Sequence, residues 1–259
     1  LTVWLDFRRT ILIPWLISPS NGFVGEDKEM KQQDQIPLRV MRIIARMNVG
    51  GPAVQVSGLM RGFDVTEFDQ RLYTGFCAAD EADYLDSVEP DIKAIRIEGL
   101  GRRVSLGSDL KAFISLVKEI REFKPHVIHT HTAKAGFLGR VASLVSLQDS
   151  IRVHTFHGHL LYGYFGPLKK SLIIVIEKLL ALITHQLLAV GSKVRQDLLK
   201  AGIGKREKFG LMPPGLVIRE LPSKDESQEF FGLSKNHLEC AFVGRITKIK
   251  RPDRLLDVV

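Results

Sequence analysis

The chain has 259 residues, of which 45% are hydrophobic and 25% are charged. This apolar content is enough for a buried core, so the composition excludes a disordered, collagen-like or low-complexity chain. The two cysteines, Cys77 and Cys240, are too few for a disulfide framework or a cysteine-rich zinc module, and they indicate a reducing compartment. The formal net charge of +8 favours an anionic partner without identifying it.

Residues 1–37 differ in character from the rest of the chain. The apolar run at 10–17 is short, is interrupted by Pro14 and lacks the layout of a signal peptide. Residues 18–37 are polar, so we interpret 1–37 as an N-terminal extension or linker. Because the chain starts without a methionine and stops within a helix-like segment, we expect it to be a fragment.

From Leu38 onward, apolar runs typical of strands alternate with amphipathic segments typical of helices. The expected strands are 38–47, 70–76, 92–99, 126–131, 151–158 and 187–190. The expected helices are 52–63, 108–123 with Ser108 as its cap, 133–146, a basic helix after Pro167, and 192–202. This alternation predicts an α/β fold in which helices cover both faces of a parallel sheet.

The alternation stops after residue 215. The chain there contains Pro222 and a charged polar stretch, followed by one new strand at 240–245 and a helix from Pro252. We therefore expect one domain at 38–215, and we expect 216–259 to form a linker and the first strand and helix of a second domain.

A Gly-Gly pair, Gly50 and Gly51, separates the first expected strand from the first expected helix. Two glycines allow close approach of a ligand to the backbone, and the free amides of a helix start are a natural phosphate site. The turn is neither a Walker loop nor a dinucleotide fingerprint, since the required lysine and third glycine are missing. A tight turn without a ligand is the alternative.

Histidines gather at the ends of two neighbouring strands. His129 and His131 are two residues apart and therefore face the same side, and His154, His157 and His159 follow on the next strand. Because open parallel sheets bind ligands at the carboxyl ends of their strands, this cluster is a candidate site. Solvated polar loops and a zinc site are the alternatives. Both strands and the residues after them lack acidic side chains, so the ligand set argues against a hydrolytic metal.

Two further basic features suggest anionic ligands. Arg245 and Lys250 project from the loop after the strand at 240–245, and such a pair suits a diphosphate. Residues 167–206 hold eight basic residues against two acidic ones, together with two apolar runs separated by Glu177 and Lys178. Neither run approaches the ~20 apolar residues that span a bilayer. The stretch is either a core-facing helix with a solvated basic face or a segment that lies on an anionic membrane surface.

Taken in order, four motifs resemble the retaining family-four glycosyltransferases of the GT-B fold, over about residues 38–259. They are MNVGGPAVQ (47–55), HTHTAKAGFLGR (129–140), VHTFHGH (153–159) and GRITKIKRPDRLL (244–256). The similarity is greatest to enzymes that build capsular, exopolysaccharide and lipopolysaccharide sugars. It implies two Rossmann-like domains that face each other across a cleft. The first would mainly bind the acceptor, and the second the nucleotide-sugar.

The resemblance also implies residue roles. His131 would be the catalytic residue that contacts the transferred sugar. His129, Lys134 and His157 would bind the acceptor. The donor diphosphate would be bound by Gly50, Gly51, Arg245 and Lys250. In such enzymes the leaving phosphate helps to deprotonate the acceptor, so no side-chain base, metal or cofactor is expected, and a UDP-sugar is the expected substrate.

Some features depart from the family pattern. Gly191 stands where a serine is usual, PPGLVI replaces an Asn-Gly-Val-Asp turn, and the chain ends before the paired-glutamate donor motif. We therefore expect a protein truncated within its C-terminal domain, and the 259-residue chain to be inactive alone.

The complete protein is expected to move a hexose or N-acetylhexosamine from a nucleotide donor to a saccharide acceptor, which is expected to be lipid-linked, with retention of configuration. This would take place in the cytoplasm at the inner face of the membrane. A nucleotide-sugar epimerase of the same fold and a non-catalytic acceptor- or membrane-binding module are the alternatives. Nucleic acid is not an expected partner, because the basic stretch lacks interleaved aromatic residues.

Overall fold

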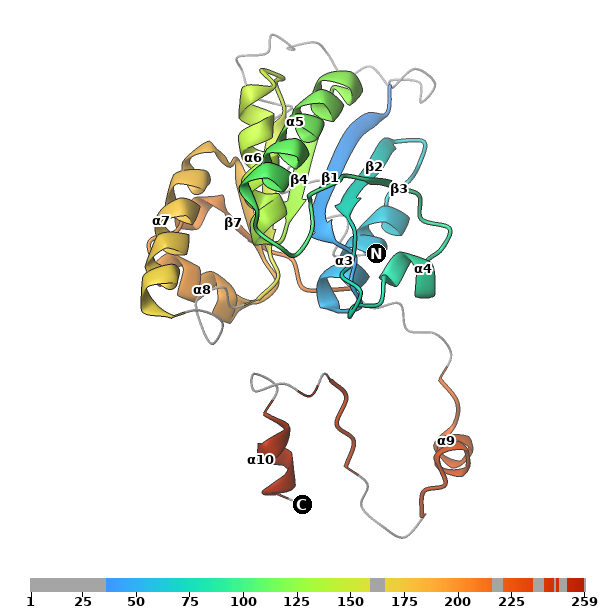
Figure 1. The fold of residues 1–259 in the computed structure, drawn as a ribbon. Helices are drawn as coiled ribbons and strands as arrows, with labels where there is room; N and C mark the ends of the chain where they lie inside the picture. Colours follow the sequence, from blue (N-terminus) through green and yellow to red (C-terminus); the bar gives the residue numbers. More distant parts are fainter. Residues whose placement is uncertain are drawn as a thin grey trace, which may run out of the picture. The chain divides into compact units, whose positions relative to one another are not determined.

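The computed structural model describes residues 36–158, 166–215, 221–234, 240–244, 246 and 251–258. These residues belong to two compact units, Leu1–Leu216 and Val217–Val259 (Figure 1). The predicted extension at 1–37 lies outside the described residues except for its last two.

The first unit is built around seven strands in the order β3-β2-β1-β4-β5-β6-β7, and every neighbouring pair is parallel. The strands are β1 (Leu38–Arg46), β2 (Phe68–Gly75), β3 (Ala94–Arg96), β4 (Val127–His131), β5 (Ile151–Phe156), β6 (Gln186–Ala189) and β7 (Phe209–Leu211). The helices are α3 (Gly51–Gly62), α4 (Tyr84–Ser87), α5 (Leu106–Phe123), α6 (Ala133–Val145), α7 (Pro167–Ile183) and α8 (Ser192–Lys200). The predicted α/β fold is therefore confirmed, with the strand order of a Rossmann-like sheet.

Helices cover both faces of this sheet, which is why β1 is an almost continuous apolar run. Met41 and Ile43 point to the face that α5 and α6 cover, and Figure 1 shows these two helices side by side. Val40 points to the opposite face, where it packs with Leu59 of α3. Alternate residues of a strand face opposite sides, so a strand covered twice has no position for a solvated side chain.

Several element boundaries differ from prediction, most clearly those of α5 and β3. α5 begins at Leu106 and has Ser105, not Ser108, at its N-cap, where the Ser105 amide donates to Asp109 (3.2 Å). The predicted strand at 92–99 is only three residues long, because it pairs with β2 alone and the chain leaves the sheet before Gly99, whose φ is +85°. A left-handed φ at glycine is typical of such a turn.

The second unit contains α9 (Lys224–Phe231) and α10 (Pro252–Leu256). The sequence did not predict α9, although its capping box was readable: Ser223 accepts from the Glu226 amide and Glu226 accepts from the Ser223 amide. The strand predicted at 240–245 is wrong for the described residues 240–244, which form neither helix nor strand. A strand requires a neighbouring strand for its backbone hydrogen bonds, and no described strand pairs with residues 240–244.

The basic helix predicted after Pro167 is α7. Its inner side packs against the core through Ala181 and Ile174. Glu177, whose sequence position separates two apolar runs, is buried and pairs with Arg140 of α6, with the Arg140 Nη2 2.8 Å from a Glu177 carboxylate oxygen. Among the described residues, no helix combines the length and the apolar character needed to cross a bilayer.

Candidate functional site

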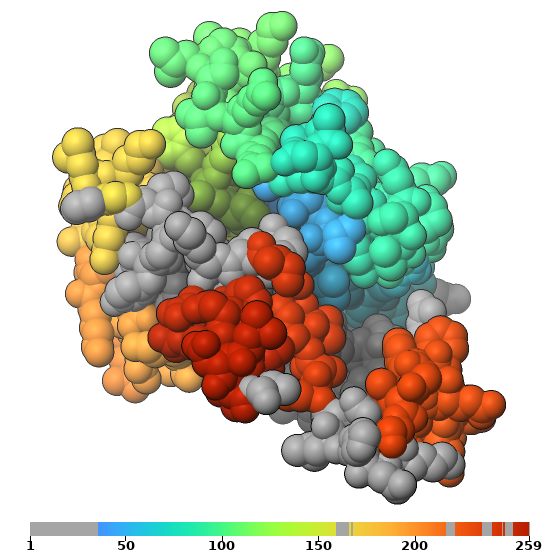
Figure 2. Space-filling view, turned by 60° about the horizontal axis from the view of Figure 1, so that its bottom comes forward, coloured from blue at the N-terminus to red at the C-terminus, as the bar shows by residue number. Residues whose placement is uncertain are grey.

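The strand order marks one edge of the sheet as the candidate site. β1 and β4 lie side by side, and the chain continues outward from them in opposite directions, through β2 and β3 on one side and β5 to β7 on the other. Open parallel sheets bind ligands outside the carboxyl ends of the strands at such a switch point. The Gly50–Gly51 turn follows β1 at this edge, and His131 ends β4 there. Figure 2 shows the surface hollowed where the blue and olive parts of the chain meet.

The Gly50–Gly51 turn opens α3 as predicted. Among the described residues, a Cβ added at Gly51 would meet no atom within 4 Å, and one at Gly50 would meet none closer than 3.9 Å. Packing of the chain itself therefore does not require glycine at either position. The helix start offers fewer amide donors than predicted, because Pro52 has no amide hydrogen and the Ala53 amide donates to the Gly50 carbonyl (3.1 Å).

Three of the predicted histidines lie together on one face of the sheet. The ring centroids of His129 and His131 are 4.1 Å apart, and those of His131 and His157 are 5.1 Å apart. His131 Nδ1 lies 2.9 Å from His157 Nε2, and His129 Nε2 lies 2.7 Å from Thr155 Oγ1. His131 is fully buried, and its Nε2 is without a hydrogen-bond partner among the described residues. A buried polar atom without a partner is unfavourable, so this nitrogen calls for an explanation.

Burial lowers the pKa of all three rings. Loss of water is the largest cause for each, and at His129 and His131 the charge of Arg42 lowers the pKa further. The pKa of His157 falls to about 4. The charged groups that act on these rings are basic ones. The rings are therefore neutral at pH 7, and a neutral imidazole can donate one hydrogen bond and accept another but is not an acid. Both nitrogens of His129 already have protein partners, Arg42 and Thr155, so the predicted contact of this ring with the acceptor is not supported by a free ring nitrogen.

The remaining histidines do not join this group. His154 faces the opposite side of the sheet, because it is one residue before Thr155 in β5; its Nδ1 lies 2.9 Å from Thr130 Oγ1 and its ring packs against Gly136 of α6. His159 lies outside the described residues, as do Arg245 and Lys250, so the roles proposed for that arginine and lysine stay predictions. Among the side chains that the structure describes, no three His, Cys, Asp or Glu residues form a metal-ligand group.

Lys134, predicted to bind the acceptor, is engaged within the protein. Its ammonium donates to the carbonyls of Gly99 (2.7 Å) and Arg103 (2.5 Å) and forms an ion pair with Asp109 (2.6 Å). An ammonium group has three donors, and these contacts use all of them. Lys134 thus fastens the loop before α5 to the start of α6, and its role toward the acceptor stays a prediction.

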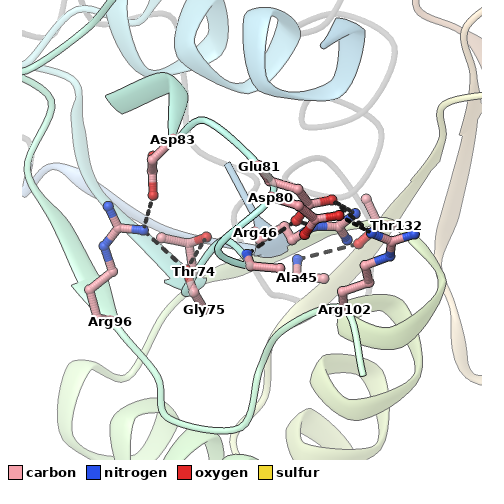
Figure 3. Close-up of polar contacts among 11 residues, drawn as sticks. Ala45, Arg46, Thr74, Gly75, Asp80, Glu81, Asp83, Arg96, Arg102 and Thr132 are labelled. Atoms are coloured by element: carbon pink, nitrogen blue, oxygen red, sulfur yellow. Dashed lines mark hydrogen bonds and ion pairs between the residues drawn. The ribbon is translucent and has the colours of Figure 1, made fainter. Parts of the chain in front are cut away.

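Sequence reasoning missed a frame of arginine–carboxylate pairs around the ends of β1 and β2 (Figure 3). Arg46 binds both carboxylate oxygens of Glu81 (2.6 and 2.7 Å), which holds the pKa of Glu81 below its usual value. Arg96 binds Asp83 (2.8 Å) and the Gly75 carbonyl (3.0 Å). The one indication of these pairs in the sequence was that charged residues directly follow the apolar strands. These acids are paired with arginines at the edge rather than with the histidines.

Thr132 connects the two central strands at the same edge. Its Oγ1 accepts a hydrogen bond from the Ala45 amide (3.3 Å), and its backbone has φ 66° and ψ 157° (Figure 3). This region is unfavourable for any residue except glycine, and especially for a β-branched one. Backbone strain of this kind concentrates at functional sites.

The sequence of the chain matches a known family and known enzymes. Residues 50–215 match the glycosyl transferase 4-like domain. Over 177 residues, 66% of this chain and 44% of its relative, the chain is 28% identical to the UDP-Gal:alpha-D-GlcNAc-diphosphoundecaprenol alpha-1,3-galactosyltransferase of Escherichia coli. Over 155 residues, 58% of this chain and 40% of its relative, it is 23% identical to the capsular polysaccharide biosynthesis glycosyltransferase CapM of Staphylococcus aureus. The chain spans less than half the length of these curated relatives.

Solved structures share the fold at low sequence identity. The sucrose-phosphate synthase of Thermosynechococcus elongatus superposes with a TM-score of 0.57 at 15% identity, covering 77% of this chain and 54% of that one. A UDP-GlcNAc 2-epimerase from Methanocaldococcus jannaschii superposes with a TM-score of 0.51 at 14% identity, covering 67% of this chain and 46% of that one. These likenesses concern the fold alone, whereas the family match covers more than half of the chain. The family resemblance inferred from the motifs is thus confirmed: the chain belongs to the glycosyl transferase 4-like family.

Proposed function

We propose that the protein transfers a sugar from a nucleotide-sugar, with UDP as the nucleotide, to a lipid-linked saccharide in surface polysaccharide biosynthesis, with retention of configuration. The observation that carries the proposal is the unpartnered Nε2 of the buried, neutral His131 at the switch point of the sheet. The name of the Escherichia coli relative, which specifies a UDP-sugar donor and a diphosphoundecaprenol-linked acceptor, supports both substrate classes.

In this proposal, the residues of the first unit position substrates rather than transfer protons. His131 Nε2 binds a hydroxyl of the transferred sugar, and His157 lies toward the acceptor. The diphosphate of the donor approaches the backbone at Gly50 and Gly51, where the absence of side chains leaves room. Neutral rings suit a retaining reaction in which a phosphate oxygen of the leaving group takes the acceptor proton, because a protonated ring would compete for that oxygen.

A binding experiment with this chain tests the acceptor part of the proposal. A short-chain prenyl-diphosphate-linked GlcNAc, titrated calorimetrically, should bind saturably to the wild type and weakly to His157→Ala. His126→Ala is the matched control, since His126 lies before β4, at the amino end of that strand, and accepts from the Arg39 amide (3.0 Å). Equal affinity of all three proteins would contradict the proposal.

A turnover experiment with the complete gene product tests the reaction. Radiolabelled UDP-sugars should yield lipid-linked product only when acceptor is present. Epimerised nucleotide-sugar formed without acceptor would establish the epimerase function instead, and binding without any product would establish a non-catalytic module. Among the described residues, no carboxylate charge acts on His131 or His157, whereas we expect an epimerase to place acids at these strand ends, which favours transfer.

We also propose that α7 lies on the anionic cytoplasmic face of a membrane and so presents the site to its lipid-linked acceptor. Its outward face carries an apolar stripe in alternating steps of four and three residues, with each side chain between 53% and 85% exposed. The α7 stripe consists of Leu168, Leu172, Val175, Leu179 and Leu182. Lys169 and Lys178 are exposed beside it. The core-facing helix expected from the sequence is present, but its outer face is apolar as well as basic, which is typical of an interfacial helix.

Vesicle co-sedimentation tests this orientation. The wild type should pellet with phosphatidylglycerol-rich vesicles and much less with phosphatidylcholine vesicles, and the double variant Leu172→Ser/Leu179→Ser should stay in the supernatant. Leu110→Ser/Ile114→Ser is the matched control, since these side chains lie on another helix, α5, and are similarly exposed, at 58% and 59%. Equal pelleting of the two double variants would show that α7 is not the membrane face.

A further inference from the structure

Arg42 is a fully buried arginine in the middle of β1, directly opposite His129 in the register of β1 and β4. Its Nη1 lies 2.8 Å from His129 Nδ1. Its Nε and Nη2 donate to Gln70 Oε1 at 3.1 and 2.9 Å, and its guanidinium carbon lies 4.9 Å from the centre of the Phe63 ring. Sequence analysis assigned this residue no function.

Burial of this cation is not offset by an ion pair. Among the described residues, no carboxylate pairs with Arg42, and burial alone lowers its pKa to about 9. The group therefore still carries its charge at neutral pH, although desolvation of a charge without a counterion is strongly unfavourable. An apolar residue would suit the middle of a covered strand better, so packing does not account for an arginine here.

The hydrogen bond from Arg42 determines the proton position on His129. A guanidinium group only donates, so His129 Nδ1 must accept, and the neutral ring then carries its proton on Nε2. That Nε2–H donates to Thr155 Oγ1 at 2.7 Å. Both ring nitrogens of His129 are thus committed, and the ring that packs 4.1 Å from His131 is held in one tautomer and one orientation.

We propose that Arg42 is a positioning residue of the sugar-binding site, which fixes the tautomer and orientation of His129 and through this ring the place of His131. The inference rests on the proposed role of His131. With the tautomer of His129 fixed, the remaining choice among these three rings is whether His131 Nδ1 or His157 Nε2 carries the proton of the hydrogen bond between them. A proton on His131 Nδ1 leaves Nε2 as an acceptor for substrate, and the reverse arrangement makes Nε2 a donor. The neutral His131 ring can therefore offer a substrate either a hydrogen-bond acceptor or a hydrogen-bond donor at Nε2.

Arg42 also opposes protonation of the His131 ring. The groups whose charge would act on His131 are His129 on its own strand, His157 after β5, Arg42 from β1 and, from the opposite side of the sheet, His154. All of them are neutral or positive, so no neighbour among the described residues stabilises an imidazolium.

Histidine-selective ¹⁵N NMR on this chain tests the inference, because the shifts of the two ring nitrogens report which one carries the proton. We expect Nε2–H at His129 in the wild type, in Arg42→Lys and in Thr155→Val, since an arginine or lysine donor enforces it even without the threonine oxygen. Arg42→Met should lose this single tautomer. His126 is the internal reference, as its Nδ1 accepts from the Arg39 amide in every variant.

An unchanged His129 tautomer in Arg42→Met would overturn the inference, and so would an Nδ1–H at His129 in Thr155→Val. If circular dichroism shows that Arg42→Met does not fold, Thr155→Val alone decides the question. These readouts need no sugar, so they can fail while the transferase proposal stands. In the complete enzyme, Arg42→Met should lower kcat more than it raises KM and should move the acid limb of the pH profile upward, and Arg42→Lys should restore both.

Discussion

His131 Nδ1 and His157 Nε2 lie 2.9 Å apart, and this hydrogen bond joins the end of β4 to the residue that follows β5. The two residues are 26 positions apart in sequence. The bond orients the His131 ring at the switch point, and Nε2 of this ring, which has no partner among the described residues, is the atom proposed to bind the transferred sugar. Four predictions follow from this and from neighbouring contacts.

The first concerns turnover. Replacement His131→Ala removes the polar atom proposed to bind the transferred sugar, so kcat of the complete enzyme should fall by about 10²-fold or more, the scale typical of a lost preorganised hydrogen bond. His126→Ala should retain most of the activity because His126 lies before β4, at the amino end of the strand. Steady-state kinetics checks both variants, and activity of His131→Ala within twofold of the wild type would be inconsistent with the site.

The second concerns pH. Burial lowers the pKa of His157 from 6.5 to about 4, so between these values the unfolded chain binds a proton that the folded chain does not. The contribution of neutral His157 to the free energy of unfolding is fully present above pH 6.5 and is lost as the pH falls toward 4. It is on the order of 3 kcal/mol. Burial also lowers the pKa of His129 and His131, so these rings too reduce the stability of the fold as the pH falls. Urea midpoints should decrease steadily from about pH 7 to about pH 4.5.

His157→Gln is the control for this pH dependence, because it removes one titrating ring while keeping a polar side chain of similar reach. Its urea midpoint should depend less steeply on pH than that of the wild type. A midpoint that is independent of pH in the wild type would show that the rings are not buried as neutral groups.

The third prediction compares two glycines. An added Cβ at Gly136 would lie 2.5 Å from His154 Cε1, so Gly136→Ala should destabilise the fold by roughly 1–3 kcal/mol through overpacking. Gly51→Ala meets no atom of the described residues within 4 Å and should leave the free energy of unfolding within about 0.5 kcal/mol of the wild type. Gly51→Ala should nevertheless weaken binding of a UDP-sugar to the complete enzyme. Equal donor affinity in that variant would remove Gly51 from the predicted diphosphate site.

The fourth concerns the buried ion pair between Arg140 and Glu177, in which Arg140 Nη2 donates to both carboxylate oxygens at 3.0 and 2.8 Å. Glu177→Ala leaves a buried guanidinium without its counterion and should cost about 3–5 kcal/mol in a urea titration. The double variant Arg140→Met/Glu177→Leu removes both charges and should recover most of that loss. If Glu177→Ala is as stable as the wild type, the pair does not join α6 to α7.

Much of the fold was predictable from the sequence by itself. The apolar run of β1, the glycines and proline that open α3, and the alternation of strands and helices are patterns among neighbouring residues, and they predicted the parallel α/β sheet. The order of the histidine motifs indicated the glycosyltransferase family. α9 was missed although its Ser223–Glu226 capping box was readable, and the strand predicted at 240–245 shows that an apolar run does not form a strand without a partner.

Other features depended on tertiary structure. The pairing of Arg42 with His129 spans 87 residues, and it exists because β1 and β4 are neighbours in a particular register. Strand alternation in β5 moved His154 to the α6 face, and packing turned Lys134 and Glu177 inward to fixed partners. Local periodicity carries no information on which strands adjoin or in what register. The sequence therefore determined the class of fold and named the candidate residues. Only the folded chain decided which of their ring nitrogens have partners among the described residues, because those partners lie on or directly after other strands.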